Sequence, residues 1–217
     1  MTRILIVRHG QTNYNVLGRY QGQLDTPLNE TGINQSNALK ERILKSKLHI
    51  DEIWSSDLQR VRNTVTPIAE TLSLPLHLHA GLREVNVGDF TDKPTTLVKE
   101  IYKEHLEEMN KNWKDAAYPN GESNADVRER IHKTVCEIAE KNDGKTVLIA
   151  SHGGTMHCLV SETFYRLGKI PPEFGIPNCS IFTFEYESGN ITLKTMENAD
   201  GEEIQITYND KKDVTVL

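Results

Sequence analysis

Short apolar runs typical of buried strands alternate along this chain with longer segments of helical periodicity. The clearest strand is predicted over residues 146–151, which read Thr-Val-Leu-Ile-Ala-Ser, and another is predicted over residues 3–7. Strands separated by helices favour an α/β fold, a three-layer sandwich around a mostly parallel central sheet. The predicted helices cover residues 29–45, 58–72, 123–141 and 153–167, and shorter extended segments cover residues 50–54 and 74–78.

Two features modify this simple pattern. Pro67 lies inside a predicted helix, where a residue without a backbone N–H is expected to kink or split the helix. Near the end of the chain, residues 179–186 and 190–196 flank a Ser-Gly turn and predict an antiparallel hairpin at the edge of the sheet. The polar tail is expected to add one edge strand over residues 204–208.

Residues 90–118 break the alternation of strands and helices. They are rich in charge and contain Trp113 and Tyr118. We expect them to form a helical, cap-like insertion over a site, within a single domain that covers residues 1–217.

The charge and cysteine content narrow the function classes. The chain has 31 acidic and 25 basic residues, a formal net charge of −6, which argues against a nucleic-acid-binding module. No run of 18 apolar residues exists, and residues 1–7 are too short for a signal peptide, so no membrane association is expected. Three widely spaced cysteines are typical of reduced thiols in a cytoplasmic protein.

Two of the predicted strands end in similar sequences. The strand predicted over residues 3–7 is followed by Arg8, His9 and a glycine. The strand predicted over residues 146–151 is followed by His152 and two glycines. Because ligands of open α/β sheets bind at the carboxyl ends of parallel strands, neighbouring strands would bring both histidines into one pocket. The glycines let backbone amides approach a ligand, and the N-terminus of the following helix would offer an anion site at the same place.

A metal site is the alternative use of two histidines. The remaining histidines show none of the spacings typical of zinc ligands, such as two on one helix face beside a carboxylate, so no metal is predicted. These remaining residues are His49, His77, His79, His105, His132 and His157.

Further motifs follow the first His-Gly step in a fixed order. They are Arg8-His9-Gly10-Gln11-Thr12 with Asn15, Gln21-Gly22-Gln23-Leu24-Asp25-Thr26-Pro27-Leu28-Asn29 with Gly32, Ser55-Ser56-Asp57-Leu58-Gln59-Arg60 with Thr64, Leu82-Arg83-Glu84 with Gly88, Pro119-Asn120-Gly121-Glu122-Ser123, and Ser151-His152-Gly153. This ordered set, spread over most of the chain, resembles the histidine phosphatase superfamily in its phosphoglycerate mutase-like branch.

The resemblance implies phosphoryl transfer through a covalent intermediate. His9 matches the family's nucleophile, which attacks phosphorus and becomes a phosphohistidine. Arg8 and Arg60 match arginines that bind phosphate, and the charge of Arg8 is expected to keep His9 neutral. His152 matches the second histidine, which in its charged form binds the transferring phosphoryl group.

Glu84 matches the family's general acid and base, which protonates the leaving oxygen and later takes a proton from water. Taken alone, this residue is more typical of a surface carboxylate or of a partner for Arg83. The resemblance is what assigns it to catalysis.

Other matching positions contact phosphate or substrate in the family. They are Asn15, Gln21 and Gly22, and Gly153 is expected to contribute a backbone amide. The alternative for these residues is a structural role, since Asn and Gly are common in turns.

Two further residues, and one departure from the family pattern, complete the sequence analysis of the site. Asn178 is an additional candidate for the pocket lining, whereas Arg62 is expected to point away from the site. After Glu84 the family often has glycine, any residue, an aromatic residue, glutamate and glycine. Here Thr91-Asp92 replaces the Glu-Gly pair, which leaves the course of this loop open.

The length and charge of the insertion separate two enzyme types within the family. The cofactor-dependent mutases carry a longer insertion with additional arginines, whereas residues 90–118 contain five lysines and no arginine. A short, arginine-poor cap predicts a pocket that is open to water. We therefore expect a phosphatase acting on a small-molecule phosphomonoester, similar to the α-ribazole, broad-specificity and fructose-2,6-bisphosphatase-like members.

Two alternatives remain beside the phosphatase. One is a mutase, which would need a bisphosphoglycerate primer, and the other is a catalytically weak module that binds a phospho-ligand. The resemblance implies no other cofactor. It also leaves a homodimer open, because dimers are common in the family and no apolar stripe in the sequence establishes one.

Overall fold

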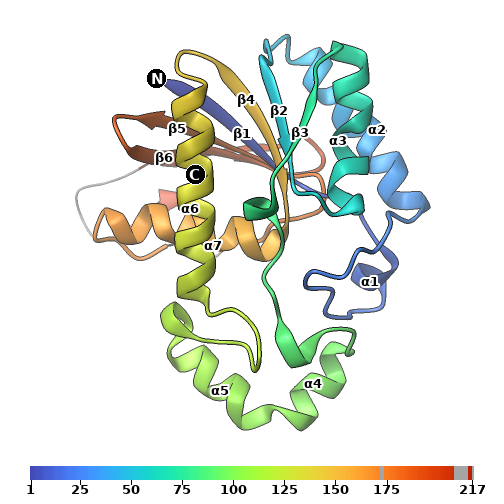
Figure 1. The fold of residues 1–217 in the computed structure, drawn as a ribbon, viewed down its shortest axis with the longest axis vertical. Helices are drawn as coiled ribbons and strands as arrows, with labels where there is room; N and C mark the ends of the chain where they lie inside the picture. The colour runs from blue at the N-terminus through green and yellow to red at the C-terminus, as the bar shows by residue number, and fades with distance from the viewer. Residues whose placement is uncertain (172–173, 208–214, 217) are drawn as a thin grey trace.

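The computed structural model describes residues 1–171, 174–207 and 215–216. Its sheet has the strand order β3-β2-β4-β1-β5-β6-β7-β8 (Figure 1). The pairs β3-β2, β2-β4 and β4-β1 are parallel, and the remaining pairs are antiparallel. The strands are β1 (Thr2–Arg8), β2 (Glu52–Ser55), β3 (Leu76–Leu78), β4 (Thr146–Ser151), β5 (Ile181–Glu187), β6 (Asn190–Glu197), β7 (Glu203–Thr207) and β8 (Thr215–Val216).

This topology confirms the predicted fold class, with one difference in extent. The antiparallel part includes the predicted hairpin, β5 and β6, but continues through β7 into β8. The expected edge strand at 204–208 therefore corresponds to β7, which pairs on both sides and is not at the edge. Tyr208 lies outside the described residues.

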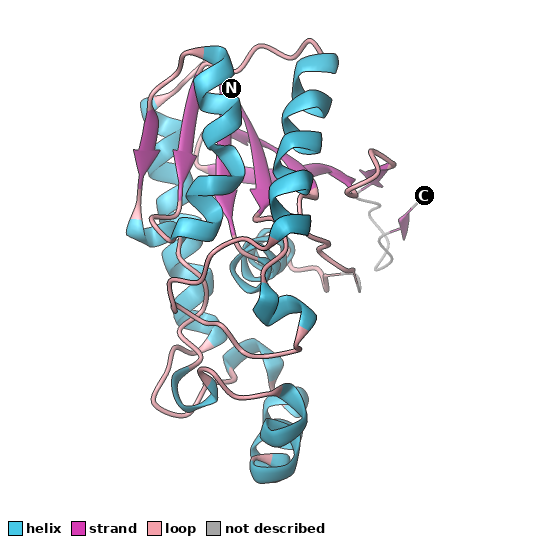
Figure 2. Cartoon of the chain, turned by 90° about the vertical axis from the view of Figure 1, so that its right-hand side faces the viewer, coloured by secondary structure: helices cyan, strands magenta, loops and turns pink. Residues whose placement is uncertain are grey.

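Helices cover both faces of the parallel part of the sheet (Figures 1 and 2). Alternate residues of β1 point to opposite faces, so that Leu5 and Val7 pack with α2 and α3, whereas Ile4 and Ile6 pack with α6 and α7. The result is the three-layer sandwich expected from the alternation of strands and helices. The four helices are α2 (Glu30–Lys45), α3 (Gln59–Leu72), α6 (Asn124–Lys141) and α7 (Gly153–Arg166).

Helix α3 runs past Pro67 without a break, so of the two effects expected of this proline, a kink or a split, the split does not occur. A proline cannot donate to the carbonyl four residues earlier, which here belongs to Asn63. The Ser36 hydroxyl of α2 lies near this carbonyl: its one hydrogen is shared between the Thr64 oxygen, the closer acceptor at 2.7 Å, and the Asn63 oxygen at 3.3 Å. A contact with a neighbouring helix thus accommodates the proline.

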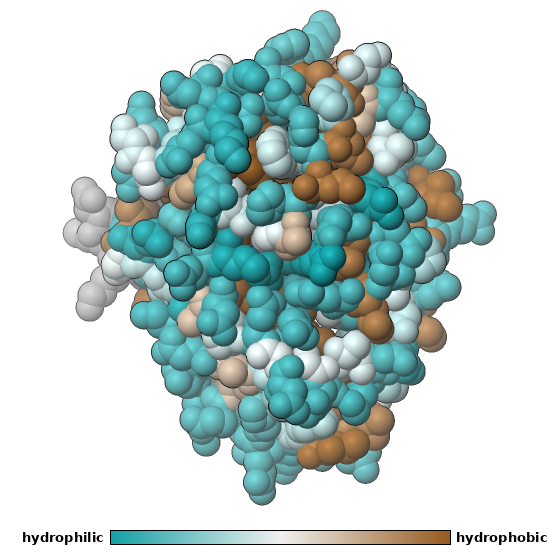
Figure 3. Space-filling view, in the orientation of Figure 1, coloured by the Kyte–Doolittle hydropathy of each residue, from teal (hydrophilic) through white to brown (hydrophobic). Residues whose placement is uncertain are grey.

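The insertion lies at the carboxyl ends of the parallel strands (Figures 1 and 2). Its Phe90 and Val98 are fully buried in the same core as α6 and α7. On its outer side, Leu97 and Ile101 are 39% and 58% exposed, and Figure 3 shows apolar surface at this end of an otherwise mostly hydrophilic face. The elements of this segment are η2 (Gly88–Phe90), α4 (Thr95–Ile101), α5 (Lys103–Lys111) and η3 (Trp113–Asp115).

The loop that departs from the family pattern has a defined course. Asp92 adopts φ +60°, the left-handed region that glycine favours and that aspartate tolerates better than most residues. Its carboxylate accepts hydrogen bonds from Tyr14 Oη (2.8 Å) and Arg19 Nη2 (2.8 Å). Asp92 therefore keeps the turn and joins the start of the insertion to the segment that follows α1 (Asn13–Val16).

Candidate active site

The two His-Gly steps meet at the carboxyl ends of β1 and β4. These strands are parallel neighbours with Arg8 opposite Ser151, and the amide of His9 donates to the Ser151 oxygen (3.1 Å). The rings of His9 and His152 lie 5.3 Å apart between centroids, at 66° to each other. Both side chains are buried, as the strand-end pattern predicts for one shared pocket.

The imidazole of His9 is oriented by a backbone carbonyl. Its Nδ1 lies 2.7 Å from the oxygen of Gly10, and because a carbonyl only accepts, Nδ1 carries the hydrogen and Nε2 has the free lone pair. Burial first, and then the charges of Arg60 and Arg8, hold the pKa of His9 well below its ordinary value of 6.5. The expected effect of Arg8 is present, but desolvation is the larger cause.

His152 contacts the hydroxyl of Ser56 through Nε2 at 3.0 Å, while its Nδ1 is buried without a hydrogen-bond partner among the described residues. Burial, followed by the charge of Arg60 and the neighbouring His9, holds the pKa of His152 well below 6.5. The surrounding protein therefore favours a neutral ring, which differs from the charged form that the resemblance implies. The negative charge of a phosphoryl group would act in the opposite direction.

Two guanidinium groups border the histidines. Arg8 donates through Nη1 to the oxygen of Ile176, and Arg60 donates to the oxygens of Leu24 (2.6 Å) and Gly22 (2.8 Å). The Nε atoms of both arginines are buried without a partner among the described residues, and burial lowers the pKa of Arg60 to about 10. Buried cations with unused donors are suited to bind an anion.

Glycines and small polar residues surround the two histidines. Gly153 begins α7, and a Cβ at this position would lie 3.1 Å from Arg8 Nε. The amide of Gly10 donates to Thr64 Oγ1 (2.9 Å), and Asn178 donates to the oxygen of His9 (2.8 Å). The structure thus places Asn178 and the matched Thr64 against the loop that carries His9.

Glu84 is held at the N-terminus of α7. Its Oε1 accepts from the amides of Val85 and Thr155, both at 3.0 Å, and lies 3.1 Å from the Thr155 hydroxyl. Its Oε2 accepts from the amide of Gly154 at 3.3 Å. Arg83 instead pairs with Asp57 (2.7 Å), so Glu84 is not the partner of Arg83.

Comparison with known proteins decides the family of this site. The family model of the histidine phosphatase superfamily (branch 1) matches residues 4–199 of the chain. The chain belongs to this superfamily. The predicted recognition and the prediction of a histidine phosphatase are therefore confirmed, and the following comparisons agree with them.

Relatives of this histidine phosphatase include both enzyme types considered from the sequence. The probable phosphoglycerate mutase GpmB of Yersinia pestis (strain Pestoides F) is 30% identical over 187 residues, 86% of each chain. A mycobacterial glucosyl-3-phosphoglycerate phosphatase in complex with VO3 is 29% identical, with a TM-score of 0.76 over 88% of this chain and 96% of that chain. A phosphoserine phosphatase mutant from Entamoeba histolytica, in complex with phosphoserine, is 26% identical, with a TM-score of 0.76 over 92% and 98%.

The loop residues predicted for this histidine phosphatase have structural contacts of their own. Asn15 Oδ1 accepts from the amide of Thr12 (3.0 Å), which caps α1, and Gln21 Oε1 accepts from the hydroxyls of Thr12 (3.0 Å) and Thr26 (2.7 Å). Gly22 adopts φ +50° and presents its carbonyl to Arg60. These contacts fit the alternative of turn chemistry, and contact of these residues with a ligand stays a prediction.

Sequence reasoning gave no role to several residues that contact the catalytic candidates. Ser56 and Thr64 lie within the matched motifs. The signal that could have identified them is a polar side chain near the site, after a strand for Ser56 and early in a helix for Thr64. Thr155 follows the His-Gly-Gly step as the third residue of α7, where the backbone N–H of a helix lacks an internal partner. Its contact with Glu84 depends on how the segment after η1 (Ala80–Leu82) approaches α7.

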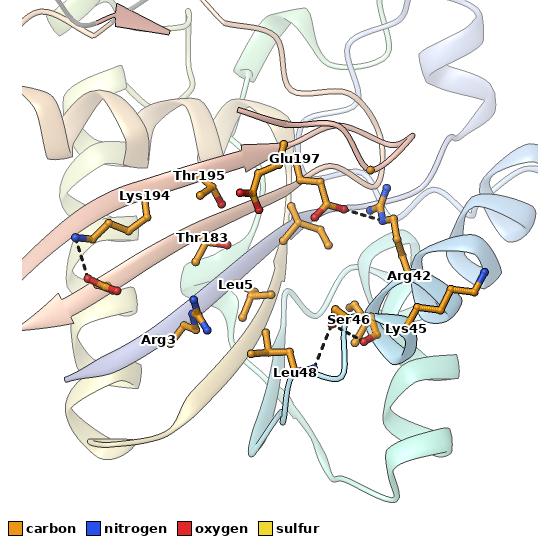
Figure 4. Close-up of a pocket in the computed structure, with 15 residues that line it drawn as sticks. Arg3, Leu5, Arg42, Lys45, Ser46, Leu48, Thr183, Lys194, Thr195 and Glu197 are labelled. Carbon is orange, nitrogen blue, oxygen red and sulfur yellow. Dashed lines mark hydrogen bonds and ion pairs between the residues drawn. The ribbon is translucent and has the colours of Figure 1, made fainter. Parts of the chain in front are cut away.

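A separate cavity of about 630 Å³ lies between α2 and strands β1, β5 and β6 of this histidine phosphatase (Figure 4). None of the predicted catalytic residues lines it. Ion pairs join Arg42 to Glu197 (3.0 Å) and Lys194 to Glu185 (2.9 Å) within it. Arg42 also donates to the backbone oxygen of Cys179 (2.6 Å). The guanidinium of Arg42 is therefore bound by groups of the protein itself.

Two features of the described part of the chain concern membranes and metal ions. None of its helices is long and apolar enough to cross a membrane. Within the same residues, no group of three or more His, Cys, Asp and Glu side chains is arranged to hold a metal ion.

Proposed function

We propose that this chain is a phosphatase that hydrolyses a small phosphomonoester through a phosphohistidine on His9, with Glu84 as general acid and base. The observation that carries the proposal is the His9 ring, whose Nδ1 lies 2.7 Å from the Gly10 oxygen and which is bordered by the buried Arg60 and the half-buried Arg8. A neutral imidazole with a free Nε2 is a competent nucleophile near neutral pH.

In the first step, His9 Nε2 attacks phosphorus and the bond to the leaving oxygen breaks. Glu84 donates a proton to that oxygen, so the alcohol leaves neutral. In the second step, water attacks phosphorus, Glu84 takes a proton from the water, and the N–P bond breaks to release phosphate. The protein ends in its initial protonation state.

The arginines and His152 would bind the oxygens of the phosphoryl group. Charge spreads over these equatorial oxygens in the transition state, and fixed donors in a water-poor site stabilise it strongly. The unused donors of Arg8 and Arg60, and the unpaired Nδ1 of His152, are the protein groups available for this role. Gly153 lets the start of α7 approach the same oxygens.

We propose that the cap-like insertion shapes the leaving-group side of the site. Phe90 is buried within the insertion. Its ring centroid lies 5.3 Å from that of Tyr20, 4.9 Å from that of Tyr102 and 5.4 Å from that of Tyr118. The contacts with Tyr102 and Tyr118 hold the segment together, and the contact with Tyr20 joins it to the loop after α1. The predicted single domain, with this segment as its cap, belongs to the same proposal.

A mutase is the second candidate, because the GpmB relative is a probable phosphoglycerate mutase. The proposal favours hydrolysis because residues 90–118 contain no arginine to bind further anionic groups of a substrate. The structurally similar glucosyl-3-phosphoglycerate phosphatase and phosphoserine phosphatase also support hydrolysis.

The deciding experiment measures phosphate release from a panel of phosphomonoesters that includes phosphoserine and 3-phosphoglycerate, with EDTA present. A mutase assay primed with 2,3-bisphosphoglycerate runs beside it, and His9→Ala is the control. Hydrolysis that survives EDTA and is lost in His9→Ala supports the proposal. Fast mutase turnover with little hydrolysis supports the second candidate, and ligand binding without either activity indicates a binding module.

A further inference from the structure

We propose that Thr155 is a positioning residue for Glu84, which fixes Oε1 and leaves Oε2 as the oxygen that transfers the proton. This inference rests on the proposed role of Glu84 as general acid and base. It concerns how α7 holds that carboxylate, and it assigns different tasks to the two oxygens.

The two carboxylate oxygens of Glu84 have unequal surroundings. Oε1 accepts from two amides at 3.0 Å, those of Val85 and Thr155, and the Thr155 hydroxyl lies 3.1 Å away. Oε2 has one amide, that of Gly154, at 3.3 Å. An oxygen whose two lone pairs already accept from two amides has little capacity to hold a proton as well. The proton therefore resides on Oε2 and leaves from there.

Thr155 contacts Glu84 at two levels. Its amide and hydroxyl face Oε1, and its hydroxyl also lies 2.8 Å from the carbonyl of Arg83, the residue before Glu84. The hydroxyl has one hydrogen, and the Arg83 carbonyl is its closer acceptor, so the side chain chiefly holds the backbone that carries the carboxylate while it borders Oε1. Thr155 is fully buried, so water has little access to replace the hydroxyl after its removal.

Gly154 makes this close approach sterically feasible. A Cβ at position 154 would lie 2.8 Å from Glu84 Oε1 and 3.1 Å from Val85 Cγ2. A methyl group there would displace the carboxylate away from the helix terminus. Gly154→Ala is therefore a second, independent way to disturb the same contact.

The kinetic signature follows from general acid catalysis. An alkoxide leaves slowly unless it is protonated, whereas p-nitrophenolate leaves well without a proton. A displaced Glu84 should therefore reduce kcat/KM for an alkyl phosphate far more than for p-nitrophenyl phosphate. General damage to the site would reduce both values alike.

The test compares Thr155→Val, Thr155→Ser and Gly154→Ala with wild type on p-nitrophenyl phosphate and on the best alkyl substrate. Thr163→Val is the matched control, because Thr163 is another buried threonine of α7, with its hydroxyl on the Val160 oxygen (2.7 Å). We expect Thr155→Val and Gly154→Ala to lose about tenfold or more in kcat/KM on the alkyl ester. The loss on p-nitrophenyl phosphate should be under about threefold, with the inhibition constant of vanadate unchanged.

Thr155→Ser should recover most of the activity on the alkyl ester, and Thr163→Val should match wild type. Equal losses on both esters, or none in Thr155→Val, would overturn the inference. Failure of the proposed function would look different, because wild type would then hydrolyse neither ester, or Glu84→Gln would lose both activities equally.

Discussion

The imidazole rings of His9 and His152 lie edge to face, 5.3 Å apart between centroids, and both are buried beside Arg60. Both pKa values are held well below 6.5, the ordinary value that applies in the unfolded chain. Below pH 6.5 the unfolded chain therefore binds protons that the folded protein does not bind. Folding stability contributed by these rings is present above pH 6.5 and falls as the pH decreases.

The first prediction is that His9→Asn and His152→Asn each weaken this acid dependence. Each histidine contributes up to about 1.4 kcal/mol of unfolding free energy per pH unit below 6.5. Urea unfolding at pH 7.5 and pH 5.5 measures how much the unfolding free energy of each protein changes between these two pH values. Asparagine at position 9 retains an N–H for the Gly10 carbonyl. If both variants keep the wild-type difference between the two pH values, then the buried rings are not neutral in the folded protein.

The second prediction concerns Arg60, whose guanidinium donates to Gly22 and Leu24 at the same time. Arg60→Lys retains a charge but lacks the planar fork, so it cannot bind both carbonyls and a phosphate. We expect kcat/KM to fall by roughly a hundredfold and the inhibition constant of inorganic phosphate to rise. Arg62→Lys, two residues away, is the matched control and should leave both quantities unchanged.

The sequence was most informative where function depends on neighbouring strands. Parallel pairing of β1 and β4 places the residues after Val7 and Ala150 side by side, so two His-Gly steps predicted one pocket. Arg60 was predicted from the family resemblance, and the structure places its helix α3 after β2, the other neighbour of β4. The order of the motifs along the chain then indicated the family.

Contacts between distant segments could not be predicted in this way. The capping of α7 by Glu84 depends on where the segment after η1 passes, which no local pattern encodes. The intact helix at Pro67 depends on Ser36, a residue of another helix. The neutral His152 depends on burial among Arg60 and His9, which tertiary packing determines.

The third prediction tests how Ser36 compensates for Pro67. Ser36→Ala removes the donor to the Asn63 carbonyl and should lower the unfolding free energy by about 1–2 kcal/mol. In a Pro67→Ala background the helix regains its own N–H for that carbonyl, so Ser36→Ala should cost less. A double-mutant cycle by urea unfolding measures the coupling, expected at about 0.5 kcal/mol or more. Additive effects would show that Ser36 stabilises α3 in another way.

The last prediction concerns the turn at Asp92, where φ is +60° and the carboxylate contacts Tyr14 and Arg19. Asp92→Gly removes both contacts but fits the left-handed backbone, whereas Asp92→Ala removes them and adds strain. Asp92→Asn tolerates the backbone and loses only the charge. Thermal unfolding should therefore rank the melting temperatures as wild type, Asn, Gly and Ala, in descending order. An alanine variant as stable as the glycine variant would contradict the left-handed turn that joins the insertion to the segment after α1.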